Sequence, residues 1–226
     1  MRRLIAFLST VSILAALAAC TPEENNSSGN DNPCPSGAVD LGLGVYWATC
    51  NLSKSGFVSS PEAYGAYYAW GETTTKYNYS WSTYKFGTSF PFSMYNLSIR
   101  TELMSEDDVA HVKLGGSWRM PTDGEWAVLI ANCTWTWTSN YNGTGVAGRI
   151  VTSNVEGYED KSIFLPAAGI RNDTDLDGAG YGGYYWSSSR YTDNPSLAMG
   201  VQFYSDRAYR RDYLRCDGLS IRPVSD

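Results

Sequence analysis

Few side chains of this 226-residue chain could carry out chemistry, and its single histidine sets the first limit. One histidine excludes a metal site built from several histidines. A Ser-His-Asp triad would have to use His111, and no nucleophile elbow accompanies that residue. Since His111 lies in a predicted helix, we expect it to be hydrogen-bonded or solvent-facing. Asp and Glu pairs could serve a glycosidase, but carboxylates are too common here to nominate two. We therefore expect no catalytic activity.

A second candidate for chemistry is the acidic stretch "NDTDLDG". Asp173, Asp175, Asp177 and Gly178 match the first half of an EF-hand loop, but the twelfth position would be Tyr184 instead of Glu. This pattern favours at most a weak calcium site. The alternative is an Asp-rich turn before the next strand. Apart from this calcium, we expect no cofactor.

The N-terminus has the pattern of an exported lipoprotein. Residues 1–19 join a positive start to a short apolar run, which is typical of a signal peptide. "LAAC" resembles a bacterial lipobox, and this resemblance implies cleavage before Cys20 and acyl chains such as palmitate on that residue. Two or more chains give stable anchoring. The alternative is a plain signal peptide followed by an unrelated cysteine.

The domain organisation follows from the composition after Cys20. Residues 20–37 are polar and rich in Asn, Ser, Gly and Pro, so we expect a flexible tether. Glu23 and Glu24 resemble the acidic signal that sends lipoproteins to the outer face of the outer membrane. Residues 38–226 form the predicted folded domain. We expect an outer-membrane lipoprotein exposed at the cell surface, in contact with the membrane through its lipid only.

The charge balance argues against nucleic acid as a partner. The chain carries a net charge of −6, and removal of Arg2 and Arg3 with the signal peptide makes it more negative. Such a surface repels phosphate backbones. Aromatic residues make up 14% of the chain, which suits an extracellular β-rich domain or a recognition surface.

The cysteine spacing favours a disulfide over a zinc site. None of the five cysteines forms a C-x-x-C pair, and an exported chain is free to form disulfides. Cys50 with Cys133 is the preferred pair, because each ends a well-patterned element. Two buried free thiols are the alternative.

The hydrophobic pattern predicts an α+β domain with two short helices and small antiparallel sheets. Alternation in "VDLGLGVYW" predicts an opening strand, and residues 71–101 have no steady period and are expected to form long loops. A first helix is predicted in "SEDDVAHVKLGG" with Ser105 as its N-cap and Gly115 at its end. Thr122 and Glu125 predict a capping box for a second helix. Five short stretches after residue 133 read as strands.

These motifs, in their order, resemble the Fibrobacter succinogenes major paralogous domain of Bacteroidetes lipoproteins. The resemblance rests on "VDLGLGVYWATCN", "YGAYYAWGET", "GGSWRMPTDGEW", "IFLPAAGIR", "GGYYWSSS" and "GLSIRPV". It implies a C-type-lectin-like fold shared with formylglycine-generating enzymes and with the variable proteins of diversity-generating retroelements. The enzymes of that group need paired cysteines or iron-binding histidines near the C-terminus. Cys216 stands alone, so their activity is not carried over.

The variable proteins of that group bind ligands near their C-terminus, and the corresponding stretch here is rich in Arg and Tyr. Such residues often supply binding hot spots. In "LAMGVQFY", alternation predicts that Gln202 and Tyr204 face outward while Val201 and Phe203 face the core. The predicted ligand-binding residues are Arg190, Tyr191, Asp193, Asn194, Gln202, Tyr204, Asp206, Arg207, Tyr209, Arg211, Tyr213 and Arg215.

The leading hypothesis is therefore a non-catalytic surface lipoprotein that binds an extracellular protein or glycan through this C-terminal face. A second hypothesis is a carbohydrate-binding module with aromatic platforms. Its candidate platforms are Trp135 with Trp137, for which core packing is the favoured reading, and Tyr77, Tyr79 and Trp81 in the long loop. A third hypothesis is a structural subunit of a cell-surface assembly. The ligand and the oligomeric state are left open.

Overall fold

The computed structural model describes residues 35–96 and 100–226. The predicted signal peptide, the lipidation site Cys20 and Cys34 lie outside the described residues. Within the described ranges, no helix combines the length and apolar character needed to cross a bilayer.

The described residues form two α-helices, two short 3-10 helices and twelve strands in small antiparallel sheets. The two short helices and the small antiparallel sheets of the prediction are confirmed. The helices are α1 (Val109–Leu114), α2 (Asp123–Asn132), η1 (Trp81–Thr83) and η2 (Tyr141–Gly143). The strands are β1 (Ala38–Asp40), β2 (Tyr46–Ala48), β3 (Trp118–Arg119), β4 (Cys133–Thr138), β5 (Gly148–Ser153), β6 (Ser162–Pro166), β7 (Ile170–Asn172), β8 (Asp175–Asp177), β9 (Gly183–Arg190), β10 (Leu197–Phe203), β11 (Ala208–Leu214) and β12 (Val224–Ser225). The sheets have the orders β1-β2-β12-β3, β11-β10-β9, β4-β5-β6 and β7-β8.

The opening strand predicted in "VDLGLGVYW" is instead a hairpin. Its alternating residues divide into β1 and β2, which pair with each other, with Val39 opposite Trp47. Gly42 and Gly44 lie between the strands with φ of 71° and 87°, a conformation that glycine adopts without strain. Leu41 and Trp47 are fully buried. The apolar face was therefore foreseen, but the glycines turn the chain back.

The two helices differ in how well their starts were predicted. Helix α1 begins after Asp108, whose carboxylate accepts hydrogen bonds from the backbone N–H groups of Ala110 and His111. The predicted N-cap Ser105 is wrong, because Asp108 is the carboxylate that reaches the free N–H groups of the first turn. Helix α2 has the predicted capping box, in which Thr122 and Glu125 exchange hydrogen bonds.

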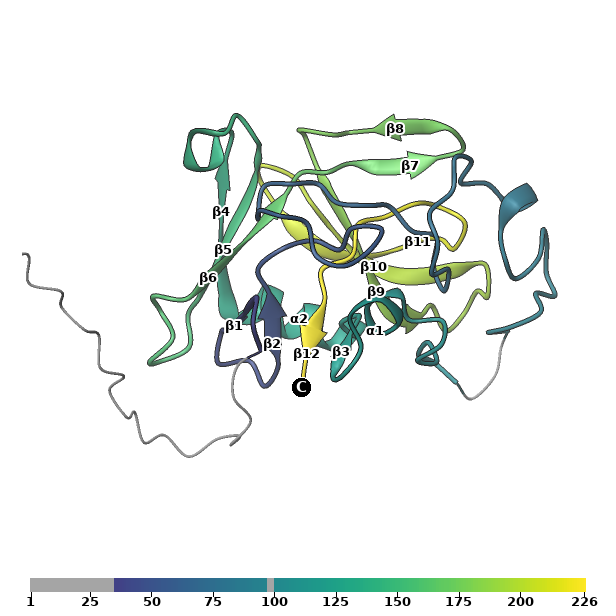
Figure 1. The fold of residues 1–226 in the computed structure, drawn as a ribbon, viewed down its shortest axis with the longest axis horizontal. Helices are drawn as coiled ribbons and strands as arrows, with labels where there is room; N and C mark the ends of the chain where they lie inside the picture. The colour runs from purple at the N-terminus through teal and green to yellow at the C-terminus, as the bar shows by residue number, and fades with distance from the viewer. Residues whose placement is uncertain (1–34, 97–99) are drawn as a thin grey trace, which may run out of the picture. The chain divides into compact units, whose positions relative to one another are not determined.

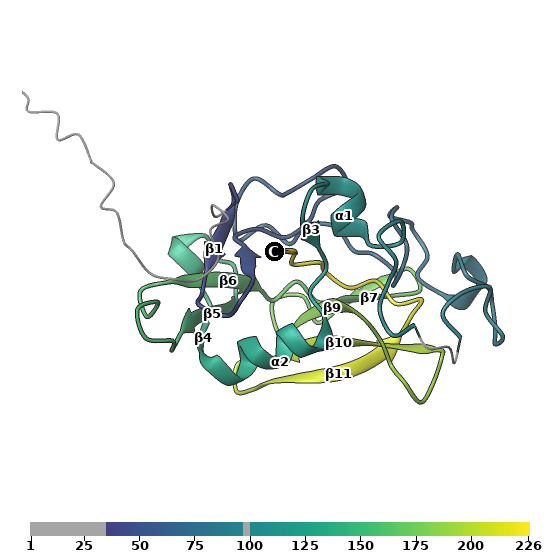
Figure 2. The same cartoon turned by 90° about the horizontal axis from the view of Figure 1, so that it is seen from below.

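Helix α2 packs against all three strands of the β11-β10-β9 sheet. Figure 2 shows the helix running beside them. Its residue Trp126 is fully buried. The indole of Trp126 lies 4.7 Å from that of Trp47 and donates a hydrogen bond to the carbonyl of Trp186. One side chain thus joins the N-terminal hairpin, the helix and the sheet.

The C-terminal segment, residues 215–225, is buried along its whole length. Figure 1 shows it running through the fold to β12, which lies between β2 and β3. Its backbone bonds to segments distant in sequence, including Leu219 with Tyr68 and Gly218 with Arg171. An extended segment can satisfy its polar groups in the interior only through such partners.

Two arginines of this segment are fully buried. The guanidinium of Arg222 donates to Asn51 Oδ1 and to the carbonyls of Ala48 and Phe164, at 2.9 to 3.0 Å. Burial lowers the pKa of this group from its usual value. These hydrogen bonds join the C-terminal segment to two other parts of the chain, residues 48–51 and strand β6.

The predicted disulfide between Cys50 and Cys133 is wrong, because both residues are free thiols. Cys133 packs among apolar side chains of the core that contains Trp47 and Trp126. Cys50 lies half-buried after the end of β2, and its sulfur accepts a hydrogen bond from the hydroxyl of Thr49. Each thiol thus has its own surroundings.

We predict that Arg222→Ala lowers the free energy of unfolding by about 3 kcal/mol or more, because it leaves several buried acceptors unpaired. Urea denaturation checks this value. The matched control, Arg211→Ala, removes an exposed arginine and should change stability by no more than about 0.5 kcal/mol. Equal effects of the two changes would contradict the role given to Arg222.

A second prediction concerns Asp217, which is 7% exposed. Burial, and to a lesser degree the negative charge of Asp173, raises the pKa of Asp217 to about 7. Between pH 4 and 7 the native state then binds more protons than the unfolded chain, so stability falls as pH rises. The loss amounts to about 1.4 kcal/mol per pKa unit. Urea denaturation from pH 4 to 8 should show that the free energy of unfolding depends less on pH in Asp217→Asn than in the wild type. The same pH dependence in both proteins would contradict a raised pKa of Asp217.

Candidate functional site

The predicted binding residues lie on β9, β10, β11 and the turns that join them, except Arg215, which follows β11 directly. Asp193 and Asn194 are exposed in the β9–β10 turn, with Tyr191 half-buried beside them, whereas Asp206 and Arg207 are exposed in the β10–β11 turn. Because β10 has seven residues, these turns are separated by about 20 Å at the usual rise of a strand. The structure does not bring the predicted residues together as one patch.

Two predicted binding residues belong to the core. Arg215 is fully buried, and its guanidinium carbon lies 4.9 Å from the ring centres of both Trp70 and Phe92. Its Nε donates to the hydroxyl of Tyr84 at 2.8 Å. Arg190 is also buried, and it donates to the carbonyls of Tyr191 and Thr192. Aromatic rings and carbonyls satisfy these charges inside the fold, so the prediction of exposed arginines is wrong at both positions.

Gln202 is also buried, with 3% of its surface exposed, although alternation predicted an outward side chain. Val201 and Phe203 are buried on the other face as predicted. The sheet is covered on both sides at this position, because tyrosines lie over the face that carries Gln202. A pattern along one strand could not show this cover.

The accessible residues around Gln202 form, together with it, what we call the tyrosine face. Its members are Tyr184, Gln202, Tyr204, Arg207, Tyr209, Arg211 and Tyr213. Gln202 lies opposite Tyr184 on one neighbouring strand and opposite Tyr209 on the other. Tyr209 donates to Gln202 Oε1 at 2.8 Å, and the amide nitrogen of Gln202 donates to the hydroxyl of Tyr204. The hydroxyls of Tyr204 and Tyr184 are 3.0 Å apart. Four side chains are thus held in one network.

Glycines allow the tyrosine rings to lie against the sheet. A Cβ at Gly182 would meet the ring of Tyr204 at 2.9 Å, and one at Gly200 would meet the carbonyl of Tyr185 at 2.6 Å and the ring of Tyr213 at 3.4 Å. Burial raises the pKa of Tyr184 to about 12, and the hydrogen bond with Tyr204 acts in the same direction. The Tyr184 hydroxyl is therefore protonated at neutral pH. The face presents rigid, neutral aromatic surface.

Positive charge borders this face. Arg207 lies over the ring of Tyr204 at 5.9 Å, and its ion pair with Asp206 is long, at 3.7 Å. Arg211 is exposed and lies opposite Gly200. The adjacent Arg210 points to the other side of the sheet, where it pairs with Asp123 of α2 at 2.6 Å. The two neighbouring arginines therefore belong to opposite surfaces.

Most of the predicted aromatic platforms are packed inside. Trp135 and Trp137 pack on the core, as favoured, and Trp135 lies against Phe203. Tyr79 is buried, and Trp81 is stacked on Phe92. Tyr77 alone of these residues is largely exposed, at 80%.

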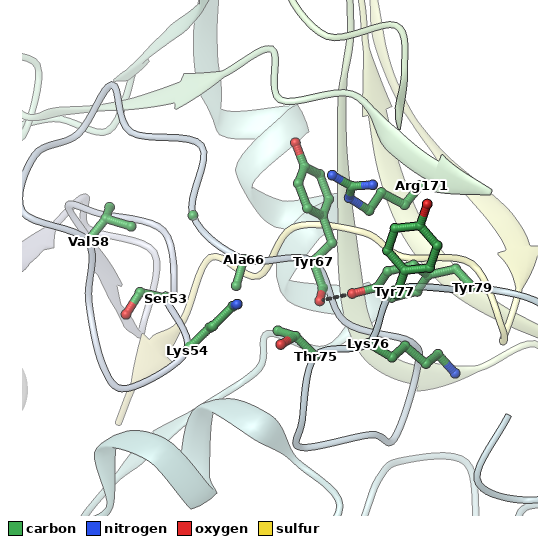
Figure 3. Close-up of a pocket in the computed structure, with 11 residues that line it drawn as sticks. Ser53, Lys54, Val58, Ala66, Tyr67, Thr75, Lys76, Tyr77, Tyr79 and Arg171 are labelled. Carbon is green, nitrogen blue, oxygen red and sulfur yellow. Dashed lines mark hydrogen bonds between the residues drawn. The ribbon is translucent and has the colours of Figure 1, made fainter. Parts of the chain in front are cut away.

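Tyr77 lies at a cleft of about 500 Å³, which Figure 3 shows with the side chains that line it. The cleft joins the loop after β2, the "YGAYYAW" stretch, the loop before η1, and β7. The alternation of Tyr77 and Tyr79 was the one feature of the sequence that pointed to this cleft. Lys54 and Arg171 also line it, and neither stood out in the sequence.

The predicted calcium loop is a β-hairpin. Asp175 and Asp177 lie in β8, opposite Asn172 and Ile170 of β7, and Asp173 sits in the turn with φ of 48°. In residues 35–96 and 100–226, no three Asp, Glu, His or Cys side chains are grouped to hold a metal ion. This arrangement matches the alternative interpretation of the stretch, an Asp-rich turn.

Two residues considered for catalysis, His111 and Cys216, are partly engaged or buried. Nδ1 of His111 lies 3.3 Å from the carbonyl of Trp118. Burial, with Asp217 nearby, raises the pKa of the Cys216 thiol to about 12. Because the thiolate is the reactive form of cysteine, Cys216 is a poor nucleophile at neutral pH.

Comparison with known proteins gives one match. A family model described as a domain of unknown function (DUF8237) matches residues 152–224. This range runs from β5 into β12 and contains the tyrosine face and Arg171. Neither curated proteins nor solved structures give a match.

We predict that Tyr204→Phe lowers the free energy of unfolding by about 1–3 kcal/mol, because it leaves the amide of the buried Gln202 without its acceptor. Thermal or urea denaturation measures the change. Tyr181→Phe serves as the control, since Tyr181 is 77% exposed and should tolerate the loss of its hydroxyl. If both variants unfold like the wild type, the network contributes nothing to stability.

Proposed function

We propose that the chain is a non-catalytic surface lipoprotein that binds an extracellular ligand, a protein in preference to a glycan, through the tyrosine face. Lipidation at Cys20 would anchor it to the outer membrane, and residues 20–37 would hold the domain away from the membrane. We further infer that the domain is C-type-lectin-like. The order of its motifs, its two helices and its small antiparallel sheets support that inference.

The observation that carries the proposal is the hydrogen-bonded network of Tyr184, Gln202, Tyr204 and Tyr209. Tyrosines held in place lose little conformational entropy when a ligand binds, and they provide both apolar area and hydroxyl groups. The network lies in an open sheet instead of a deep pocket, which suits the flat surface of a protein partner.

The charge at the face favours an acidic partner. Arg207 and Arg211 are exposed at it, while the whole chain carries a net charge of −6. Arginine beside tyrosine is a frequent combination in binding hot spots. Complementary charge would also speed the encounter with the partner, more strongly at low salt.

A non-catalytic role is supported by the state of the reactive groups. The only histidine of the sequence faces a backbone carbonyl, and burial raises the pKa of the Cys133 and Cys216 thiols. A structural role in a surface assembly is the alternative. Self-association that depends on the tyrosine face, with no other ligand, would favour that alternative.

The test is capture of extracellular proteins by the immobilised chain, followed by affinity measurement with each purified partner. We expect Tyr209→Ala with Arg211→Ala to weaken the affinity at least about tenfold, or about 1.4 kcal/mol. The matched control is Arg210→Ala, because it removes the neighbouring arginine on the opposite side of the sheet. A partner that binds both variants as it binds the wild type would refute a ligand site at the tyrosine face.

A further inference from the structure

The lining of the cleft at Tyr77 contains more positive than negative side chains. Lys54, Lys76 and Arg171 are among the residues that line it, and no Asp or Glu lines it. This is unexpected in a chain with a net charge of −6. A cleft of this composition favours anions.

Two of the three cations are available to a ligand. Lys76 is engaged, since its Nζ is 2.8 Å from Glu72 Oε1 and also donates to the carbonyl of Thr83. Lys54 is exposed, and no side chain of the described residues pairs with it. In Figure 3, Lys54 extends toward Ala66, whereas the Nζ of Lys76 points away from Lys54.

Arg171 is held in position without a carboxylate. Its guanidinium carbon lies 5.3 Å from the ring centre of Tyr67, and its Nη1 donates to the carbonyl of Thr174 at the long distance of 3.4 Å. Figure 3 shows the guanidinium beside the Tyr67 ring. A guanidinium packed on an aromatic ring keeps N–H groups at its edge for a planar carboxylate.

The aromatic walls of the cleft are rigid. Tyr67 donates its hydroxyl to the carbonyl of Ala168, and Tyr79 donates to the carbonyl of Tyr67 at 2.6 Å. Gly218 of the C-terminal segment lies directly behind Tyr79, because a Cβ there would meet the Tyr79 ring at 2.7 Å. These buried rings therefore hold the lining of the cleft in a fixed position.

Tyr77 differs from the wall tyrosines because its ring stands in solvent at the cleft. An exposed ring next to hydroxyl groups can pack against the C–H face of a pyranose through dispersion and apolar contact. Ser53 and Thr75, which also line the cleft, provide hydroxyls for a sugar. The volume of about 500 Å³ lies within the range of small-molecule sites.

We propose that this cleft binds a saccharide that carries a carboxylate, such as a uronic or sialic acid unit. Lys54 and Arg171 bind the carboxylate, and Tyr77 packs on the sugar ring. The site shares no residue with the tyrosine face. Saccharide binding in the cleft can therefore be confirmed or refuted independently of ligand binding at the tyrosine face.

The test is calorimetric titration of the full chain with a galacturonic acid trimer and with sialyllactose. The neutral comparisons are the methyl-esterified trimer and lactose. We expect at least one acidic probe to bind, with an affinity at least about tenfold above that of its neutral counterpart and weaker at high salt. Absence of binding by both acidic probes at millimolar concentration, or equal binding of the neutral forms, would overturn the proposal.

Matched variants locate the binding. Lys54→Ala and Arg171→Gln should each weaken the affinity about tenfold or more, because charge-assisted hydrogen bonds are lost. Tyr77→Ala should weaken it several-fold. The controls are Lys161→Ala and Tyr181→Ala, an exposed lysine and an exposed tyrosine outside both the cleft and the tyrosine face. Because Lys54 is exposed, Lys54→Ala should leave the fold intact, so a loss of affinity in this variant reports on binding alone. Unchanged affinity in both Lys54→Ala and Arg171→Gln would refute the site.

Discussion

The buried C-terminal segment is the constraint on which the rest of the structure depends. An extended chain that crosses the interior must find a partner for every backbone polar group, and residues 215–225 find theirs in β2, β3, the "YGAYYAW" stretch and β7. Arg222 and Arg215 add charged donors that are bonded to carbonyls, an amide and a phenol. Burying a charge is costly unless such partners are in place. The segment therefore requires its neighbours to assemble around it.

The same segment supports both proposed binding surfaces. Gly218 packs behind Tyr79 in the wall of the cleft, and its backbone bonds to Arg171. The N–H of Ser220 bonds to the carbonyl of Tyr184, which belongs to the tyrosine face. Rings fixed from behind in this way pay less entropy on binding than rings in a mobile loop. We infer that the burial of this segment, and not the loops alone, gives the surfaces their rigidity.

The two surfaces suit different partners. The tyrosine face is a sheet surface with aromatic rings and exposed Arg207 and Arg211, which suits a protein. The cleft is concave and combines a stacked guanidinium with an exposed ring, which suits a small acidic ligand. Both are positive areas on an acidic chain, so charge favours acidic partners at each of them. On a lipid-anchored domain, these partners would be extracellular.

Local patterns in the sequence determined the capping box at Thr122, the strands β4, β9 and β10, the α+β class and the scarcity of catalytic groups. These features depend on neighbours a few residues apart. Tertiary structure decided whether Gln202, Arg190 and Arg215 were exposed, because tyrosines of the paired strands cover Gln202 and distant loops contact the two arginines. It likewise left Cys50 and Cys133 as free thiols and placed Lys54, Tyr77 and Arg171 in the lining of one cleft. The physical reason is that burial and site formation depend on contacts between residues far apart in sequence, which a pattern along one strand does not contain.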